Sequence, residues 1–293
     1  MTEASQLDIE HLRGWIGRSE EASDVLTDRL VRGLLATIAG DAQKPWDSAD
    51  VPLTMHWCLA PPIAPMAALG PDGHPARGGF LPPTPLPRRM WAGGRLEFHD
   101  RLKRGDSVAR RSVIRDVTAK QGRSGTLCFV TVDHDITTAR GLAIRERQDI
   151  VYREAEPPRS GAAPAGGAAT PSPPATPAAQ WQRVIPCSPV LLFRYSALTF
   201  NGHRIHYDRS YCRDEENYPG LVVHGPLQAT LLVEFAASLR GGRTPTAFDF
   251  RGVSPLFDGA DFTLNASDAD DGSLRLWTAD AHGWTTMEAK AVW

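Results

Sequence analysis

The sequence lacks the features that mark secreted, membrane-spanning and nucleic-acid-binding proteins. Its four cysteines are scattered through 293 residues without a CxxC pair, so neither a disulfide framework nor a zinc site is predicted. No apolar run approaches the roughly 18 residues needed to cross a bilayer, and the mixed, acidic start does not resemble a signal peptide. The net charge of −2, without a basic cluster, argues against a nucleic-acid partner. We therefore expect a cytoplasmic protein without a membrane anchor.

One internal segment has almost nothing to bury. Residues 155–180 consist mainly of Pro, Gly, Ala and Ser, and prolines interrupt both helices and central strands. The rest of the chain has enough apolar residues for a core, since the overall apolar content is 42%. The composition predicts an exposed linker at 155–180 between an N-terminal domain, 1–154, and a C-terminal domain, 181–293, each of ordinary domain size.

The N-terminal part is predicted to contain one helix followed by strands. Residues 19–40 carry apolar side chains at helical spacing and end in glycine, which indicates an amphipathic helix. Four alternating stretches separated by turn residues then predict consecutive antiparallel strands: RMWAGGRLEFHD, SVARRSVIRDVTAK, GTLCFVTVDHDITT and LAIRERQDIVYRE.

The C-terminal part repeats this order. An apolar helix is predicted over 226–239, and four further strand candidates follow it. An antiparallel sheet wrapped on a central helix is the hotdog arrangement, so the sequence predicts an α+β protein with a double hotdog, two sheets each with a central helix. The alternative is a single α+β domain with a disordered insertion.

The stretch RYSALTFNGHRIHYD, residues 194–208, concentrates groups suited to proton transfer. His206 is a candidate acid/base because imidazole titrates near neutral pH. Asn201 cannot take a proton, but its amide oxygen can hold a water molecule. Gly225 opens the apolar helix, where a free backbone N–H can bind an oxyanion. We predict Asn201, His206 and Gly225 as catalytic residues.

Each of these residues also has a purely structural interpretation. Asn201 could cap the short helix that contains His206, His206 could be a hydrogen-bonded core histidine, and Gly225 could serve only the start of its helix. His203 lies three residues before His206, but no further ligand at a suitable spacing completes a metal site. No metal is predicted.

The pattern Tyr195…Asn201–x4–His206–x–Asp208, followed by GLVVHG, resembles the hydratase motif of MaoC-like enoyl-CoA hydratases, a G-D-x-N-P-x-H stretch with a later HG. The segment PRRMWAGGRLEF, residues 87–98, adds a similarity to hydratases of mesaconyl-C4-CoA and itaconyl-CoA and to mitochondrial-type 3-hydroxyacyl-thioester dehydratases. One departure matters. Asn201 replaces the catalytic Asp of the motif and His203 replaces its Asn, so the family's two-group acid/base scheme does not carry over intact.

The resemblance implies a hydro-lyase that reversibly adds water to a short enoyl-CoA thioester, with a C5-dicarboxylyl group favoured. CoA would be part of the substrate and no cofactor would be needed. The C-terminal half would carry the catalytic residues and the N-terminal half would bind substrate, as a monomer or a homodimer. Substrate contacts are expected from Arg88, Arg89, Trp91, Tyr195 and His224. The guanidinium groups suit a carboxylate or the CoA phosphates, although they could equally belong to a solvated face.

Three other functions remain open from the sequence. They are a 3-hydroxyacyl-CoA or acyl-carrier dehydratase of another chain type, a hotdog thioesterase, and a non-catalytic acyl-CoA-binding subunit. A fold alone does not assign chemistry. The spacing of Asn201 and His206 argues against the binding subunit, which would not need an aligned proton acceptor.

Overall fold

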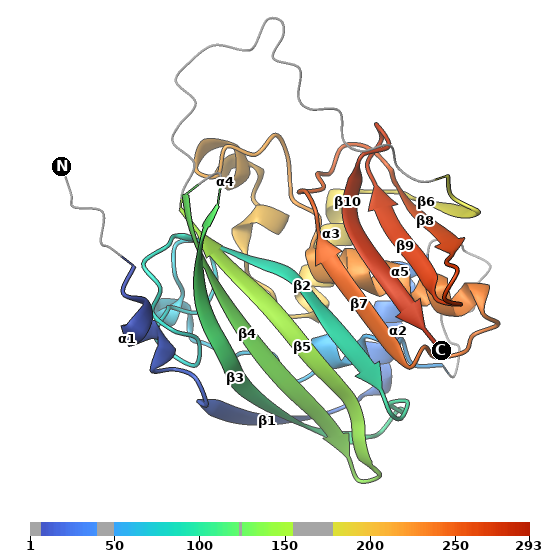
Figure 1. Ribbon diagram of the computed structural model, residues 1–293, viewed down its shortest axis with the longest axis horizontal. Coiled ribbons are helices and arrows are strands. Elements are labelled where there is room, and N and C mark those ends of the chain that lie inside the picture. Colours follow the sequence, from blue (N-terminus) through green and yellow to red (C-terminus); the bar gives the residue numbers. More distant parts are fainter. Residues whose placement is uncertain (1–6, 40–49, 123–124, 155–177) are drawn as a thin grey trace, which may run out of the picture.

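The computed structural model describes residues 7–39, 50–122, 125–154 and 178–293 (Figure 1). The predicted linker at 155–180 lies almost entirely outside the described residues, so it stays a prediction. None of the helices in these ranges is long and apolar enough to cross a membrane.

The N-terminal half is dominated by long antiparallel strands. The four strands predicted from alternation are confirmed, and a fifth precedes them. A short helix, α1 (Ile9–Arg13), starts the described chain. The strands are β1 (Ser19–Val25), β2 (Arg88–Phe98), β3 (Ser107–Gly122), β4 (Gly125–Thr138) and β5 (Gly141–Arg153).

The helix predicted over 19–40 is wrong in its first part. Residues Ser19–Val25 form β1, which pairs with β3, and the helix α2 covers only Asp28–Ile38. Small and polar residues alternate between half-buried and exposed positions along β1, a period of two that its low apolar content concealed. Thr27 caps the helix, because its side-chain oxygen accepts the N–H of Leu30 at 3.3 Å.

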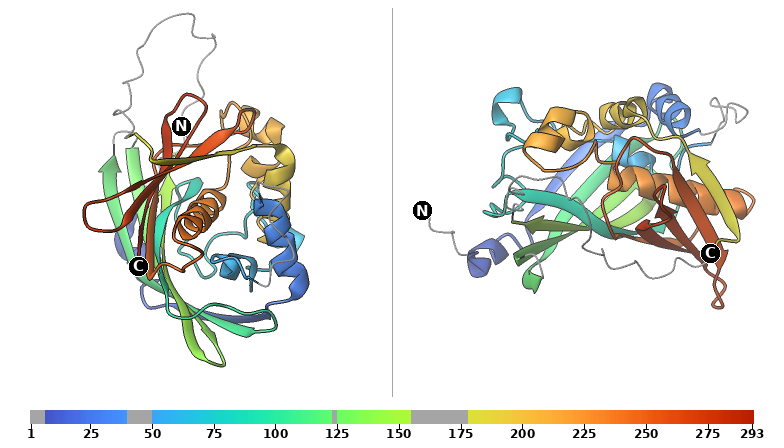
Figure 2. Two further views of the ribbon diagram at one scale, coloured as in Figure 1. Left: turned by 90° about the vertical axis from the view of Figure 1, so that its right-hand side faces the viewer. Right: turned by 90° about the horizontal axis from the view of Figure 1, so that it is seen from above.

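The C-terminal half confirms the predicted helix and its four strands, and adds elements before them. The apolar helix α5 (Gly225–Leu239) is buried on nearly all sides and lies inside the curve of the sheet (Figure 2). The remaining elements are β6 (Trp181–Ile185), α3 (Pro189–Leu198), the 3₁₀ turn η3 (Arg204–His206), α4 (Arg209–Asp214), β7 (Ala247–Gly252), β8 (Phe262–Asp268), β9 (Leu274–Ala279) and β10 (Thr285–Val292).

The strands of the two halves join into one sheet. Its ten strands run in the order β1-β3-β4-β5-β2-β7-β10-β9-β8-β6, with β2 of the first half paired to β7 of the second (Figure 1). Gly93 allows this join, because a Cβ there would lie 2.5 Å from the carbonyl oxygen of Phe250 in β7. Gly94 allows the pairing on the other side of β2, because a Cβ there would clash with the carbonyl oxygen of Arg147 in β5. The two predicted sheets are therefore continuous. The sequence MWAGG lies within β2, as predicted, and the strand has a bulge between Trp91 and Gly93.

The helices are distributed unequally between the halves. Helix α5 packs on strands of the C-terminal half and on β2, whereas α2 packs against α3 and the 3₁₀ turn η1 (Met55–Cys58). The expectation of a central helix is thus met in the C-terminal half, while α2 lies beside α3 (Figure 2). A cavity of about 1510 Å³ is lined by residues of both halves, among them residues of the sheet and of the loops before β2 and after α3.

Candidate active site

The cavity brings together most of the predicted site residues. Asn201, His203, His206 and Gly225 line it from the C-terminal half, and His74, Arg89 and Trp91 line it from the N-terminal half. Segments that lie more than a hundred residues apart in the sequence therefore line one cavity. The predicted residues Arg88, Tyr195 and His224 are not part of this lining.

His206 has the protonation state of a base. Its Nδ1 lies 2.8 Å from the carbonyl oxygen of Val222, and because a carbonyl only accepts, Nδ1 carries the proton and Nε2 keeps a lone pair. Burial lowers the pKa of His206 to about 4, against the smaller raising effect of the Val222 carbonyl. The imidazole is therefore neutral at pH 7 and can accept a proton at Nε2.

Tyr195 and His224 lie behind His206 instead of on the cavity wall. The ring of His224 stacks on that of His206 with a centroid distance of 3.5 Å and an interplanar angle of 18°. Its Nε2 is 2.8 Å from the hydroxyl oxygen of Ser196, and the ring of Tyr195 meets it edge-on at 5.0 Å. Both side chains are buried. His224 therefore supports the ring of His206, and Tyr195 supports that of His224. Neither side chain lines the cavity, so their predicted substrate contact stays a prediction.

Asn201 is oriented by the backbone that follows it. Its side-chain oxygen accepts the N–H of His203 at 3.0 Å, a local turn typical of asparagine. The same oxygen has a second lone pair, and the residue lines the cavity. The Asn201 side chain therefore stabilises the local turn and could also hold a water molecule in the cavity. Its catalytic role stays a prediction.

Gly225 is the first residue of α5, with His224 before it as N-cap. The first N–H groups of a helix have no acceptor within it, and the helix dipole favours negative charge there. A Cβ at Gly225 would be 3.7 Å from the carbonyl oxygen of Trp91, an ordinary contact, so crowding by the protein does not require glycine. The cavity side of Gly225 is suited to an oxygen atom that gains negative charge.

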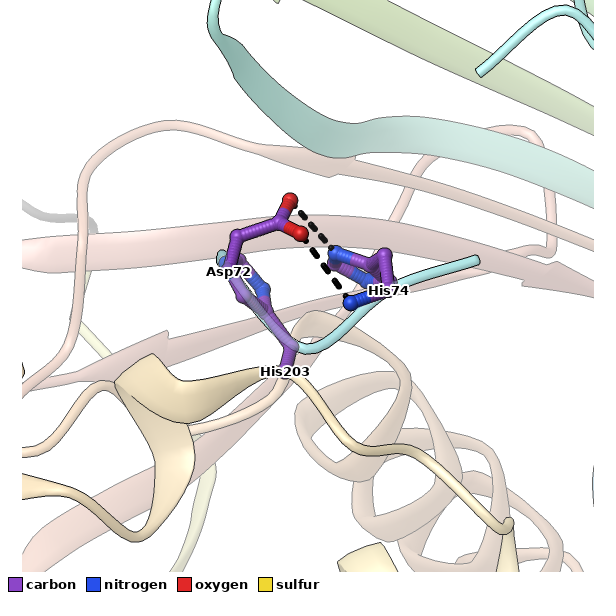
Figure 3. Close-up of side chains that lie close together, drawn as sticks. All are labelled: Asp72, His74 and His203. Atoms are coloured by element: carbon purple, nitrogen blue, oxygen red, sulfur yellow. Dashed lines mark hydrogen bonds and ion pairs between the residues drawn. The ribbon is translucent and has the colours of Figure 1, made fainter. Parts of the chain in front are cut away.

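Sequence reasoning missed two residues of the N-terminal half, Asp72 and His74. Nδ1 of His74 lies 3.1 Å from Oδ2 of Asp72, and the ring of His74 lies 4.1 Å from that of His203. Figure 3 shows these three side chains together. Both missed residues lie in a loop rich in Pro and Gly, without periodicity; the available signal was the spacing of a carboxylate and an imidazole two residues apart.

Burial and the contacts within the cluster together set its charge states. Burial acts to raise the pKa of Asp72, but the hydrogen bond and charge of His74 outweigh it and hold that pKa well below its usual range. Burial lowers the pKa of His74, with Asp72 opposing. Burial also lowers the pKa of His203, and His74 and His206 add to the effect. At neutral pH the cluster is one carboxylate with neutral imidazoles. Its donor atoms lie within 4.8 Å of one another, so it could also hold a metal ion.

The two adjacent arginines of β2 face different surroundings, as expected from the alternation of a strand. Arg88 is buried, and its Nε lies 2.9 Å from a carboxylate oxygen of Glu216. Its guanidinium also lies 5.6 Å from the ring centre of Tyr218. Arg89 lines the cavity, and so does Trp91, whose indole N–H donates to the carbonyl of Gly93 at 2.9 Å. Arg89 can therefore contact a substrate in the cavity, whereas the guanidinium of Arg88 is already paired with the carboxylate of Glu216.

Comparison with known proteins places this site in a defined class. The mesaconyl-C4-CoA hydratase of Chloroflexus aurantiacus is 47% identical over 280 residues, covering 94% of this chain and 95% of that protein. The mitochondrial hydroxyacyl-thioester dehydratase type 2 of Schizosaccharomyces pombe is 26% identical over 272 residues, covering 80% and 85%. The chain is thus an acyl-thioester hydratase or dehydratase, as predicted.

Similar solved structures confirm the fold. A MaoC-like dehydratase from Phytophthora capsici has a TM-score of 0.67 at 12% identity and 98% coverage of both chains. A Mycobacterium tuberculosis protein described as a double hotdog has a TM-score of 0.53 at 14% identity, covering 94% of this chain and 95% of the other.

Residues 54–258 match the family described as hydroxyacyl-thioester dehydratase type 2. The chain belongs to this family.

Proposed function

We propose that the chain reversibly adds water to the double bond of a C5-dicarboxylyl-CoA thioester, mesaconyl-C4-CoA or itaconyl-CoA. The observation that carries this proposal is the neutral, buried His206, with Nε2 as its acceptor, lining the same cavity as the first N–H of α5 at Gly225. The relative that is 47% identical supports the acyl group, since it is named a mesaconyl-C4-CoA hydratase.

The residues of the cavity can perform each step of hydration. The water oxygen bonds to the β-carbon while its proton passes to Nε2 of His206, a contribution worth about 10²–10⁴ in rate. The electron pair of the double bond moves toward the thioester oxygen, where the Gly225 N–H can stabilise the negative charge. The electron pair then returns from that oxygen, the α-carbon takes a proton from an acid of the cavity, and the proton on His206 passes to solvent. The second lone pair of the Asn201 side-chain oxygen can aim the water.

The position of the substrate carboxylate favours Arg89 as its partner. In mesaconyl-C4-CoA the free carboxylate is attached to the β-carbon, the atom that receives the hydroxyl group, so its cation must lie close to the base. Arg89 lines the cavity, and its charge contributes to lowering the pKa of both His74 and His203. Among the predicted arginines, Arg89 is therefore the one beside the histidines.

Free thiols support a reducing compartment. In the described part of the chain, Cys58, Cys128, Cys187 and Cys212 are all free, which fits our proposal of a cytoplasmic enzyme. We also propose that the reaction needs no cofactor beyond the CoA of its substrate and that the chain works as a monomer or a homodimer, with no nucleic-acid partner.

Two assays run together separate the proposal from its alternatives. A hydratase lowers the absorbance of the enoyl-thioester band without releasing thiol, a thioesterase releases free CoA, and a binding subunit does neither. The acyl specificity is tested with Arg89→Leu, assayed on mesaconyl-C4-CoA and on crotonyl-CoA, which has no carboxylate. Loss of a charge-assisted hydrogen bond of about 1.5–3 kcal/mol should lower kcat/KM for the first substrate about ten- to a hundredfold. An equal decrease of kcat/KM for both substrates would show that Arg89 does not contact the substrate carboxylate.

A further inference from the structure

The proposed reaction requires two proton transfers, one from the water and one to the α-carbon. His206 can supply one of them. Asn201, which stands where the related motif has an acid, has no proton-accepting group. A second group is therefore wanted on the same cavity wall, and the N-terminal half provides an imidazole there.

We propose that His74, positioned by Asp72, is a second acid/base residue of the site and transfers the proton at the α-carbon. This inference rests on the proposed hydratase function. It makes the N-terminal half a contributor to catalysis, in contrast to the expectation that only the C-terminal half is catalytic.

The Asp72 carboxylate holds His74 at two points. Oδ2 accepts the ring Nδ1–H at 3.1 Å, and Oδ1 accepts the backbone N–H of the same residue at 3.0 Å. A carboxylate cannot donate when ionised, so Nδ1 carries the proton and Nε2 is the acceptor. An imidazole that is oriented by a carboxylate is a common arrangement for a general acid/base. The His74 side chain lines the cavity and is 20% exposed, so a ligand can reach it.

The loop that carries this pair is bound to the catalytic segment itself. The backbone N–H of Arg204 donates to the carbonyl of Asp72 at 2.9 Å, and its guanidinium donates to the carbonyl of Pro71 at 3.0 Å. Gly73, at φ +86°, approaches Gly202 so closely that a Cβ would lie 2.0 Å from its carbonyl oxygen. The position of His74 is therefore fixed by the same residues that shape the Asn201–His206 segment.

The imidazoles form a continuous row along the wall. His203 lies between the two proposed acid/base residues, with ring centroids 4.1 Å from His74 and 5.4 Å from His206. A substrate lying along this row can meet one imidazole at its α-carbon and the other at the water that attacks the β-carbon. In hydration His74 must start as the imidazolium, with a second proton on Nε2 that the Asp72 carboxylate stabilises. It gives this proton to the α-carbon, the water proton goes to Nε2 of His206, and both imidazoles then return to their starting states by proton exchange with solvent. In dehydration the neutral His74 takes the α-proton at Nε2.

The test compares His74→Gln and Asp72→Asn with wild type, with His282→Gln as a control at an exposed histidine. Hydration is followed with a substrate that the wild type turns over, and exchange of the α-hydrogen of the hydroxyacyl product is followed in D2O by NMR. We expect His74→Gln to lower kcat and α-hydrogen exchange at least about a hundredfold, with KM and melting temperature little changed. Asp72→Asn should lose less activity, and the alkaline limb of its pH profile for hydration should move to lower pH, because the carboxylate stabilises the protonated His74 that donates to the α-carbon.

Four outcomes decide the matter. Wild-type protein that hydrates no enoyl-CoA refutes the proposed function itself. Active wild type with His74→Gln above about a third of its activity refutes only the role of His74. Loss of hydration with unchanged α-hydrogen exchange assigns the α-carbon proton to another residue and also overturns the inference. Stoichiometric metal in purified wild type, lost in His74→Gln together with activity, would assign Asp72, His74 and His203 to a metal site instead.

Discussion

Replacing His206 tests the central assignment of the site. His206→Gln keeps a side chain of similar length that can still donate to the Val222 carbonyl, but it removes the proton acceptor. Because a positioned base contributes about 10²–10⁴ in rate, the barrier should rise by about 3–5.5 kcal/mol. Alanine is the poorer choice, since His206 is buried and stacked on His224, and its truncation would also leave a void.

The fold should tolerate the glutamine. One weakened hydrogen bond costs about 1 kcal/mol, which for a chain of this length lowers the melting temperature by only about 2–4 °C. The measurements are kcat/KM from the enoyl-thioester absorbance and a thermal melt by circular dichroism, with His11→Gln as a control at an exposed position. Activity above about a tenth of wild type in a folded variant would refute the assignment, because no general base is then being lost.

The same residue predicts a pH dependence. Burial lowers the pKa of His206 to about 4, so the neutral, active imidazole persists well below the ordinary histidine range and is lost only as the pH falls toward 4. The acid limb that His206 sets in kcat/KM should therefore lie near pH 4. A limb at pH 6.5 that disappears in His206→Gln would contradict the buried environment described for this ring.

Three further predictions concern neighbouring features. Asn201→Ala should lose at least about tenfold in kcat and Asn201→Asp should retain substantial activity; normal turnover by the alanine variant would leave Asn201 only its turn hydrogen bond. Burial acts to raise the pKa of Glu146, but the hydrogen bond and charge of His56 outweigh it and hold that pKa at about 2, below its ordinary 4.5. The free energy of unfolding should therefore decrease as the pH falls from 4.5 to 2. Chemical denaturation of Glu146→Gln should show a smaller decrease over the same pH range. Gly73→Ala should reduce activity more than a melting temperature decrease explains, because its Cβ would lie 2.0 Å from the Gly202 oxygen at a positive φ; full activity would show that this contact does not position the site.

The regular elements were predictable where one signal dominates. Strands β2 to β5 and β7 to β10 have alternation or turn residues strong enough to read, and α5 is apolar along its whole length. Strand β1 was not predicted, because its half-buried positions hold small or polar side chains and its sequence therefore shows no alternation of apolar and polar residues. The pairing of β2 with β7 joins residues about 150 positions apart, and no local pattern specifies such a partner.

The cavity lining was predictable where its residues belong to short sequence motifs. Arg89 and Trp91, from a motif of the N-terminal half, line the same cavity as the residues of the C-terminal motif. Asn201, His206 and Gly225 come from one motif and all line the cavity. Asp72 and His74 come from an irregular loop, and only tertiary packing brings them beside His203. Arg88 and Arg89 looked equivalent in sequence; the partner Glu216, supplied from far along the chain, distinguishes them.

The pairing of β2 with β7 limits how the enzyme can move. Five residue pairs, from Gly93 opposite Arg251 to Glu97 opposite Ala247, connect the two halves, and Arg95 adds an ion pair of 2.7 Å to Asp249 across the same boundary. Separating the halves like a hinge would break these ladder bonds, each worth about 1 kcal/mol net. Substrate entry and product release are then left to the loops around the cavity, and the rate of turnover should depend on loop opening instead of domain closure.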